Sequence, residues 1–153
     1  MTSRTVHDSK VEMTEIVLPN DTNQLGNCMG GRVMHLMDIC CAIAARRHAR
    51  TTCVTAAVDQ INFVQPVPMG SVLILKASVN YAGRSSMEIG VRVETESTRS
   101  GERSHCASAY MTFVALDEDK KPMPVPKLVP ETENEIRRHD KAVERRQRRL
   151  QQR

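Results

Sequence analysis

The sequence predicts an α+β fold in which one antiparallel sheet curls around a single helix. Two observations carry this prediction: a nearly all-apolar helical stretch lies early in the chain, and four strand-like segments follow it with short connections. Short connections favour antiparallel neighbours, because parallel strands need long crossovers. One strand, one long helix and four more strands form the order expected for a helix packed on a sheet. With 153 residues, the chain is long enough for one domain with its own core.

The first strand is expected at residues 11–18, whereas residues 1–10 show no pattern and are expected to be disordered. A loop rich in turn formers then leads to the glycine pair Gly30 and Gly31. The helix that follows, ending near Ala49, carries apolar side chains on nearly every side, which is typical of a buried helix. One sheet cannot cover such a helix completely, so we expect a second copy of the chain to pack beside it.

Four further strands are expected in the middle of the chain, each bounded by proline, glycine or Ser-Gly turns. They cover residues 53–65, 71–81, 86–98 and 103–116. The third alternates between apolar and mostly charged side chains, which indicates one packed face and one face in water. Glu88 belongs to the face expected in water.

The C-terminal part differs from the domain predicted at residues 11–130. A proline-rich run at 122–130 is expected to be extended, and residues 131–153 are expected to form a charged surface helix or tail. That tail holds eight Lys or Arg and five Asp or Glu, so it carries three of the chain's four net positive charges. The domain is therefore almost neutral, and the two Phe, two Tyr and no Trp offer few stacking platforms. No nucleic-acid partner is predicted.

Cysteine usage and hydropathy indicate the compartment. The five cysteines are odd in number and show no metal-ligand spacing, so neither a disulfide framework nor a metal site is predicted. Free thiols fit a reducing cytoplasm. No apolar run approaches the roughly 20 residues that span a membrane, and the polar first residues are unlike a signal peptide. We therefore expect a cytoplasmic protein without a membrane partner.

Four segments in the same order resemble the hotdog-fold acyl-CoA thioesterases of the bacterial and brain-type acyl-CoA hydrolases. They are DTNQLGNCMGGRVMHLMD at 21–38, VTAAVDQINFVQPVPMG at 54–70, GRSSMEI at 83–89 and KPMPVPKLVPETENE at 121–135. The resemblance implies a five- or six-stranded antiparallel sheet wrapped around a long central helix, with active sites at a dimer interface and three dimers in a hexamer. It also implies hydrolysis of acyl-CoA to a free fatty acid and coenzyme A. No cofactor is implied, since coenzyme A belongs to the substrate.

The resemblance assigns roles to residues of the loop and helix. Asp38 matches the general base or nucleophile, and Asn23 matches the second catalytic group, contributed by the other subunit. Thioester hydrolysis also needs donors for the developing oxyanion, which the backbone at Gly30 and Gly31 would supply at the positive end of the helix. From the residues alone, Asp38 could equally be a structural carboxylate and Asn23 a turn residue.

One turn and two strand residues complete the predicted site. The turn consists of Gly83, Arg84, Ser85 and Ser86. Its plainest interpretation is a hairpin with a solvated arginine, whereas the resemblance places it beside the nucleotide part of coenzyme A, where Arg84 and backbone N–H groups would bind phosphates. Asp59 and Asn62, polar residues in an apolar strand, are expected to support the site by satisfying each other or the interface.

Two other functions compete with hydrolysis. A hotdog dehydratase uses a catalytic histidine in a His/Pro-rich loop, and no such loop precedes Gly30. A non-catalytic acyl-CoA-binding regulator would be expected to carry a DNA-binding helix-turn-helix and to lack the acid, whereas Asp38 is present.

Overall fold

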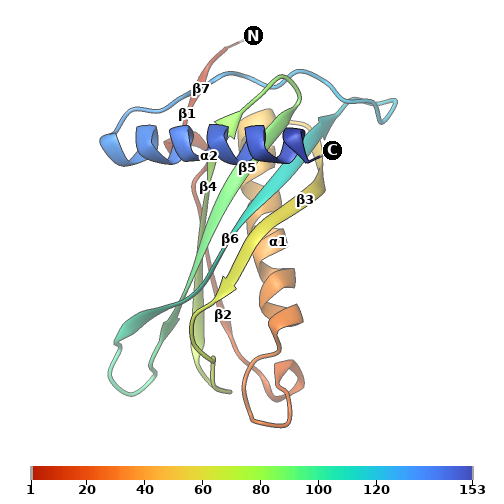
Figure 1. Cartoon of the computed structure of the whole chain (residues 1–153). Helices are drawn as coiled ribbons and strands as arrows, with labels where there is room; N and C mark the ends of the chain where they lie inside the picture. The colour runs from red at the N-terminus through yellow and green to blue at the C-terminus, as the bar shows by residue number, and fades with distance from the viewer. Residues whose placement is uncertain (1, 153) are drawn as a thin grey trace.

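The computed structural model describes residues 2–152 as a five-stranded antiparallel sheet with helix α1 (Gly30–Ala49) against one face (Figure 1). The strand order is β2-β4-β5-β6-β3. The strands are β2 (Val11–Ile16), β3 (Thr52–Phe63), β4 (Val72–Ala82), β5 (Ser86–Glu96) and β6 (Arg103–Leu116). The predicted α+β fold, one sheet wrapped around a long helix, is confirmed. No helix among residues 2–152 is both long and apolar enough to cross a bilayer.

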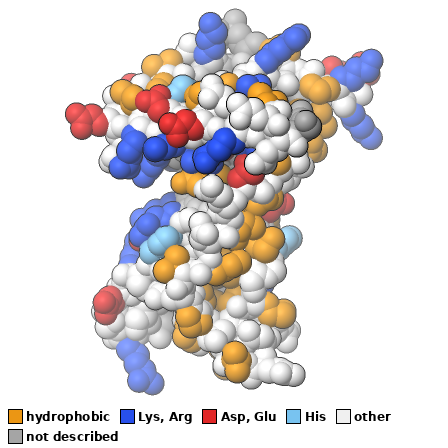
Figure 2. Space-filling view, in the orientation of Figure 1, with side chains coloured by type: hydrophobic (Ala, Val, Ile, Leu, Met, Phe, Trp, Pro, Cys, Tyr) orange, Lys and Arg blue, Asp and Glu red, His pale blue; other side chains and the backbone are white. Residues whose placement is uncertain are grey.

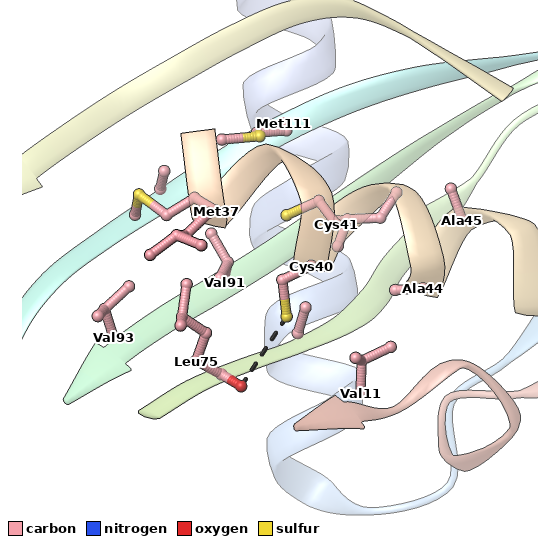
Figure 3. Close-up of a cluster of buried hydrophobic side chains, with 14 of the residues drawn as sticks. Val11, Met37, Cys40, Cys41, Ala44, Ala45, Leu75, Val91, Val93 and Met111 are labelled. Carbon is pink, nitrogen blue, oxygen red and sulfur yellow. Dashed lines mark hydrogen bonds between the residues drawn. The ribbon is translucent and has the colours of Figure 1, made fainter. Parts of the chain in front are cut away.

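The core lies between α1 and the inner face of the sheet. Its helical side chains recur at the spacing of one helix face: Val33, Leu36, Met37, Cys40, Cys41, Ala44 and Ala45. Figure 3 shows Cys40 and Met37 directed at side chains of the sheet. The Sγ atom of Cys40 lies 3.8 Å from the carbonyl oxygen of Leu75, so the helix approaches the backbone of β4 closely. Burial of each large side chain of this kind stabilises the fold by about 1.5–3 kcal/mol.

One flank of the helix is not covered. Met34 and Ile39 of α1 are 39% and 37% exposed, and Val54 and Val58 of β3 are 44% and 43% exposed. Strand β3 is the last strand of the sheet, and among residues 2–152 its outer edge has no partner. Figure 2 shows hydrophobic side chains along the side where α1 and β3 lie. These four residues define the α1–β3 flank, the apolar surface on which the predicted second copy would pack.

The expectation that residues 1–10 are disordered is wrong for residues 4–9. Strand β1 (Arg4–Thr5) pairs in parallel with β7 (Leu128–Val129), and the short helix η1 (His7–Ser9) follows. The buried Ser9 hydroxyl donates to the carbonyl of Val6 and accepts a hydrogen bond from the backbone N–H of Val79. Specific hydrogen bonds, rather than an apolar pattern, hold this segment, and a pattern search does not detect them.

The C-terminal helix α2 (Glu133–Gln151) lies across the outer face of the sheet and is not a separate tail (Figure 1). Its Arg145 donates two hydrogen bonds to Glu88, from Nε to Oε1 over 2.7 Å and from Nη2 to Oε2 over 2.8 Å. Both side chains are buried, with Glu88 only 2% exposed. The prediction that Glu88 faces water is therefore wrong, because α2 covers this carboxylate and supplies its counter-charge.

Candidate active site

Asp38 lies in the third turn of α1, beside β3. Its Oδ1 accepts a hydrogen bond from the Oγ1 hydroxyl of Thr55, over 2.7 Å. Within a single chain Asp38 is half-buried, not fully buried as the sequence predicted. Because Thr55 holds Oδ1, the other carboxylate oxygen is the one left to take a proton or attack a carbonyl. Thr55 is not among the predicted site residues, since a threonine in a strand is unremarkable until packing places it against the helix.

Asn23 lies in the loop before α1 with its side chain oriented by the backbone. Its Oδ1 accepts hydrogen bonds from the N–H groups of Leu25, at 3.0 Å, and Asn27, at 3.2 Å. The amide Nδ2 must then point away from these donors, and among residues 2–152 no acceptor takes its hydrogen atoms, so it can donate to a ligand. Asp21, by contrast, is engaged within the fold, since its Oδ1 lies 3.2 Å from the Nε of Arg32.

The start of α1 offers backbone donors. The N-cap residue Met29 makes no side-chain cap, so the first N–H groups of the helix lack the usual partner. A Cβ atom at Gly31 would meet nothing within 4 Å, whereas one at Gly30 would lie 3.5 Å from the ring of Phe63. A substrate carbonyl can therefore approach the backbone most closely at Gly31. A cavity of about 360 Å³ opens beside this helix start, and both Asn23 and Gly30 line it.

Asp38 is not among the residues that line this cavity. Asp38 lies eight residue steps after Gly30, a distance of about 12 Å along the helix axis. The structure therefore groups Asn23 with the helix start and, separately, Asp38 with Thr55. A single site that contains both groups requires a second chain.

The turn from Gly83 to Ser86 connects β4 to β5 and lies level with Asp38 across the sheet. Ser86 pairs with Val114 of β6, which in turn pairs with Val54 of β3, next to Thr55. Two strand spacings, about 10 Å, thus separate the turn from β3, the strand whose Thr55 binds Asp38. The turn itself is closed by a 2.8 Å hydrogen bond from the N–H of Gly83 to the carbonyl of Ser86, and Arg84 is exposed.

The two supporting residues do not satisfy each other. The Oδ2 of Asp59 lies 2.5 Å from Nη1 of Arg149, on the face of the sheet that α2 covers. Asn62 is exposed and donates from Nδ2 to the carbonyl of Gln60 over 3.4 Å, at an irregularity in β3 where Gln60 has φ 50°. Asp59 therefore helps to dock α2, and the expectation that Asp59 and Asn62 satisfy each other is wrong, whereas their contribution to an interface stays a prediction.

Two thiols line the cavity at the helix start, Cys28 and Cys106. Burial raises the pKa of the Cys28 thiol, and it raises the pKa of Cys106 to about 11. Both thiols are therefore protonated near neutral pH and are poor nucleophiles. The carboxylate of Asp38 is therefore better suited than either thiol to activate water or to attack a thioester.

The chain matches known proteins over nearly its whole length. The family profile of the Thioesterase superfamily matches residues 25–102. An uncharacterized acyl-CoA thioester hydrolase of Bacillus subtilis, YkhA, is 43% identical over 143 residues, which cover 94% of this chain and 83% of that protein. An apo-hexameric acyl-CoA thioesterase superimposes with a TM-score of 0.95 at 38% identity and covers 99% of this chain and 97% of its own.

A third similar protein has been solved with ligands. The acyl-CoA hydrolase of Staphylococcus aureus, in complex with butyryl coenzyme A, coenzyme A and coenzyme A disulfide, gives a TM-score of 0.92 at 36% identity and covers 98% of this chain and 92% of its own. Structures of the same hydrolase include variants in which an aspartate, an asparagine or a threonine is replaced by alanine. These matches confirm the hotdog fold, and the chain belongs to the thioesterase superfamily.

Proposed function

We propose that the chain hydrolyses acyl-CoA thioesters to a free carboxylic acid and coenzyme A, without a cofactor, in the fatty-acid metabolism of the cytoplasm. The observation that carries this proposal is the Asp38–Thr55 hydrogen bond, which fixes a carboxylate at the edge of an apolar flank. The acyl-CoA hydrolases to which the chain is similar, and the coenzyme A complexes of the S. aureus hydrolase, support the substrate class.

In the proposed reaction, the free oxygen of Asp38 either removes a proton from water or attacks the thioester carbon directly. Thr55 orients the carboxylate in both routes, because it holds the other oxygen. The carbonyl oxygen gains negative charge in the transition state, and the backbone N–H at Gly31 would stabilise it. The Nδ2 of Asn23 would hold either the water or the same carbonyl oxygen. The bond between carbonyl carbon and sulfur then breaks, and coenzyme A leaves as the thiol.

The proposed site forms between two chains. Asp38 lies beside the apolar α1–β3 flank, near the middle of the helix, whereas Asn23 and Gly31 lie at the start of the helix. Two chains that pack antiparallel through this flank would bring the helix start of one chain to Asp38 of the other. We extend this proposal to three such dimers in a hexamer, which the hexameric thioesterase similar to this chain supports.

The first experiment measures thiol release from acyl-CoAs of increasing chain length. We compare wild type with Asp38→Asn, which keeps the size of the side chain but removes its basicity, and with Asn23→Ala. Asp140→Asn, which changes an exposed carboxylate of α2, serves as the matched control. We expect Asp38→Asn to lose at least about a hundredfold in kcat and the control to lose none. A wild type that binds acyl-CoA without releasing thiol would be a binding protein instead.

A mixing experiment tests whether two chains share the site. Equal amounts of Asp38→Asn and Asn23→Ala chains are unfolded together and refolded. Half of the dimers would then contain one of each chain, and one of the two sites in each would be intact, so activity should return to about a quarter of wild type. No recovery above the two separate variants would show that Asp38 and Asn23 act within one chain.

A further inference from the structure

A strap of extended chain behind the Gly83–Ser86 turn connects that turn to the end of α1. The strap comprises residues 123–127, where prolines alternate with residues that retain an N–H group. The N–H of Met123 donates to the carbonyl of Ala115 over 2.9 Å, and the N–H of Val125 donates to the carbonyl of Arg84 over 2.8 Å. The alternation thus leaves the N–H of Met123 for the sheet and the N–H of Val125 for the turn.

His48, in the last turn of α1, anchors this strap. Its Nε2 lies 2.7 Å from the carbonyl oxygen of Pro126, and because a carbonyl can only accept, Nε2 carries the proton. The imidazole is 0% exposed, and within residues 2–152 its Nδ1 has no hydrogen-bond partner. The backbone carbonyl of His48 accepts a further hydrogen bond from Nε of Arg4, over 2.7 Å. The imidazole of His48 therefore makes one hydrogen bond within residues 2–152, to the carbonyl oxygen of Pro126.

The turn that the strap holds presents backbone donors. The carbonyls of Arg84 and Ser85 both accept hydrogen bonds from the protein behind them, from Val125 and from the N–H of Ala115 at 2.9 Å. No acceptor is found for the N–H groups of Arg84 and Ser85 in the described part of the chain. Two N–H groups without an acceptor among residues 2–152, next to the exposed Arg84, form a set of donors suited to phosphate oxygens.

We propose that His48 is a positioning residue for coenzyme A binding, which acts through the strap to fix the orientation of the Arg84–Ser85 peptide. The proposal rests on the proposed function. The hydrogen bonds from His48 to Pro126 and from Val125 to Arg84 join adjacent strap residues, so loss of the first loosens the second. The turn lies about 10 Å across the sheet from β3, the strand whose Thr55 binds Asp38. His48 therefore affects binding of the phosphate-bearing end of the substrate, and the reacting thioester is unaffected.

The test compares an acyl-CoA with the acyl-pantetheine thioester that carries the same acyl group but no nucleotide. His48→Leu removes the donor, and we expect its KM for acyl-CoA to rise about tenfold, with kcat and the KM for acyl-pantetheine within about twofold of wild type. His48→Gln can still donate to Pro126 and should restore most of the loss. Arg84→Ala should show the same division between the two substrates, because it removes a phosphate-binding group.

Ser9→Ala is the matched control, since Ser9 is also a buried side chain bonded to backbone but does not contact the turn or strap. If His48→Leu does not fold, His48→Asn, whose shorter side chain does not reach Pro126, takes its place. The positioning role is overturned if His48→Leu changes KM equally for both substrates or for neither. It is also overturned if Ser9→Ala raises KM for acyl-CoA but not for acyl-pantetheine. The proposed function fails separately, if wild type releases thiol from neither substrate, and the positioning role then fails with it.

Discussion

The buried pair of Glu88 and Arg145 gives a prediction about stability that can be worked out from the structure. Replacing Arg145 with Leu leaves the Glu88 carboxylate, 2% exposed, with only the Nδ2 of Asn80 at 3.2 Å as a polar partner. It also removes the guanidinium that lies 3.6 Å from the centre of the Tyr110 ring. An unpaired buried charge costs about 3–5 kcal/mol. We therefore expect Arg145→Leu to lower the free energy of unfolding by about 4 kcal/mol.

Urea unfolding followed by circular dichroism measures this loss, at one fixed protein concentration because the assembly contributes to stability. With a slope of about 2 kcal/mol per molar urea, the midpoint should fall by about 2 M. The double variant Glu88→Leu and Arg145→Leu removes both charges, and it should regain most of the loss. Arg103→Leu is the control: Arg103 pairs with Glu96 at 3.0 Å on the surface, and it should lose less than about 1 kcal/mol.

The reasoning about burial is refuted by either of two results. If Arg145→Leu destabilises the protein no more than Arg103→Leu does, α2 does not exclude water from Glu88. If the double variant unfolds as easily as Arg145→Leu alone, the cost comes from lost packing of α2 rather than from an unpaired charge.

Three further predictions concern the site and its surroundings. Thr55→Val should keep the fold but lower kcat for thiol release by about tenfold to a hundredfold, because Asp38 loses the hydrogen-bond donor that orients it. An unchanged kcat would show that this hydrogen bond does not contribute to turnover. Gly31→Ala should leave the melting temperature within about 2 °C of wild type, since the added methyl group meets nothing within 4 Å. It should nevertheless lower kcat/KM at least about tenfold, because the methyl group keeps the substrate carbonyl away from the helix start. Full activity would show that the oxyanion binds elsewhere. Burial lowers the pKa of His48 from its ordinary value of 6.5, and the positive charge of Arg4 lowers it further. The hydrogen bond to Pro126 and the negative charge of Asp8 act in the opposite direction. The unfolded chain then takes up this proton at a higher pH than the folded chain, so the stability from neutral His48 is complete above about pH 6.5 and is lost as the pH falls toward the lowered pKa. His48→Gln should flatten the unfolding free energy between about pH 7 and pH 5, and an unaltered slope would assign it to other groups.

The parts of the fold that depend on local pattern were predictable. The strand predicted at residues 103–116 is β6, Arg103–Leu116. Its bounds were predictable because turn residues stand immediately before and after it in the sequence. Helix α1 and the alternation along β5 follow from the same periodicities.

The parts that depend on contacts between distant residues were not predictable. Glu88 meets Arg145 across 57 residues, and His48 meets Pro126 across 78. Nothing near either partner in the sequence signals these contacts, since a charged residue on an alternating strand ordinarily faces water. For the same reason Thr55 could not be recognised before its contact with Asp38 was known, and Asn23 stood out from the neighbouring turn residues only through a family resemblance.

The pairing of Glu88 with Arg145 also has a consequence for the chain during its synthesis. A ribosome that adds about 5–20 residues per second needs about 3–11 s to extend the chain over the 57 residues that separate the two partners. During that interval the sheet can begin to assemble, but its outer face holds a carboxylate without a counter-charge. That carboxylate faces water until α2 emerges, so the sheet can form first, and the docking of α2 then has to remove water from Glu88 as Arg145 arrives.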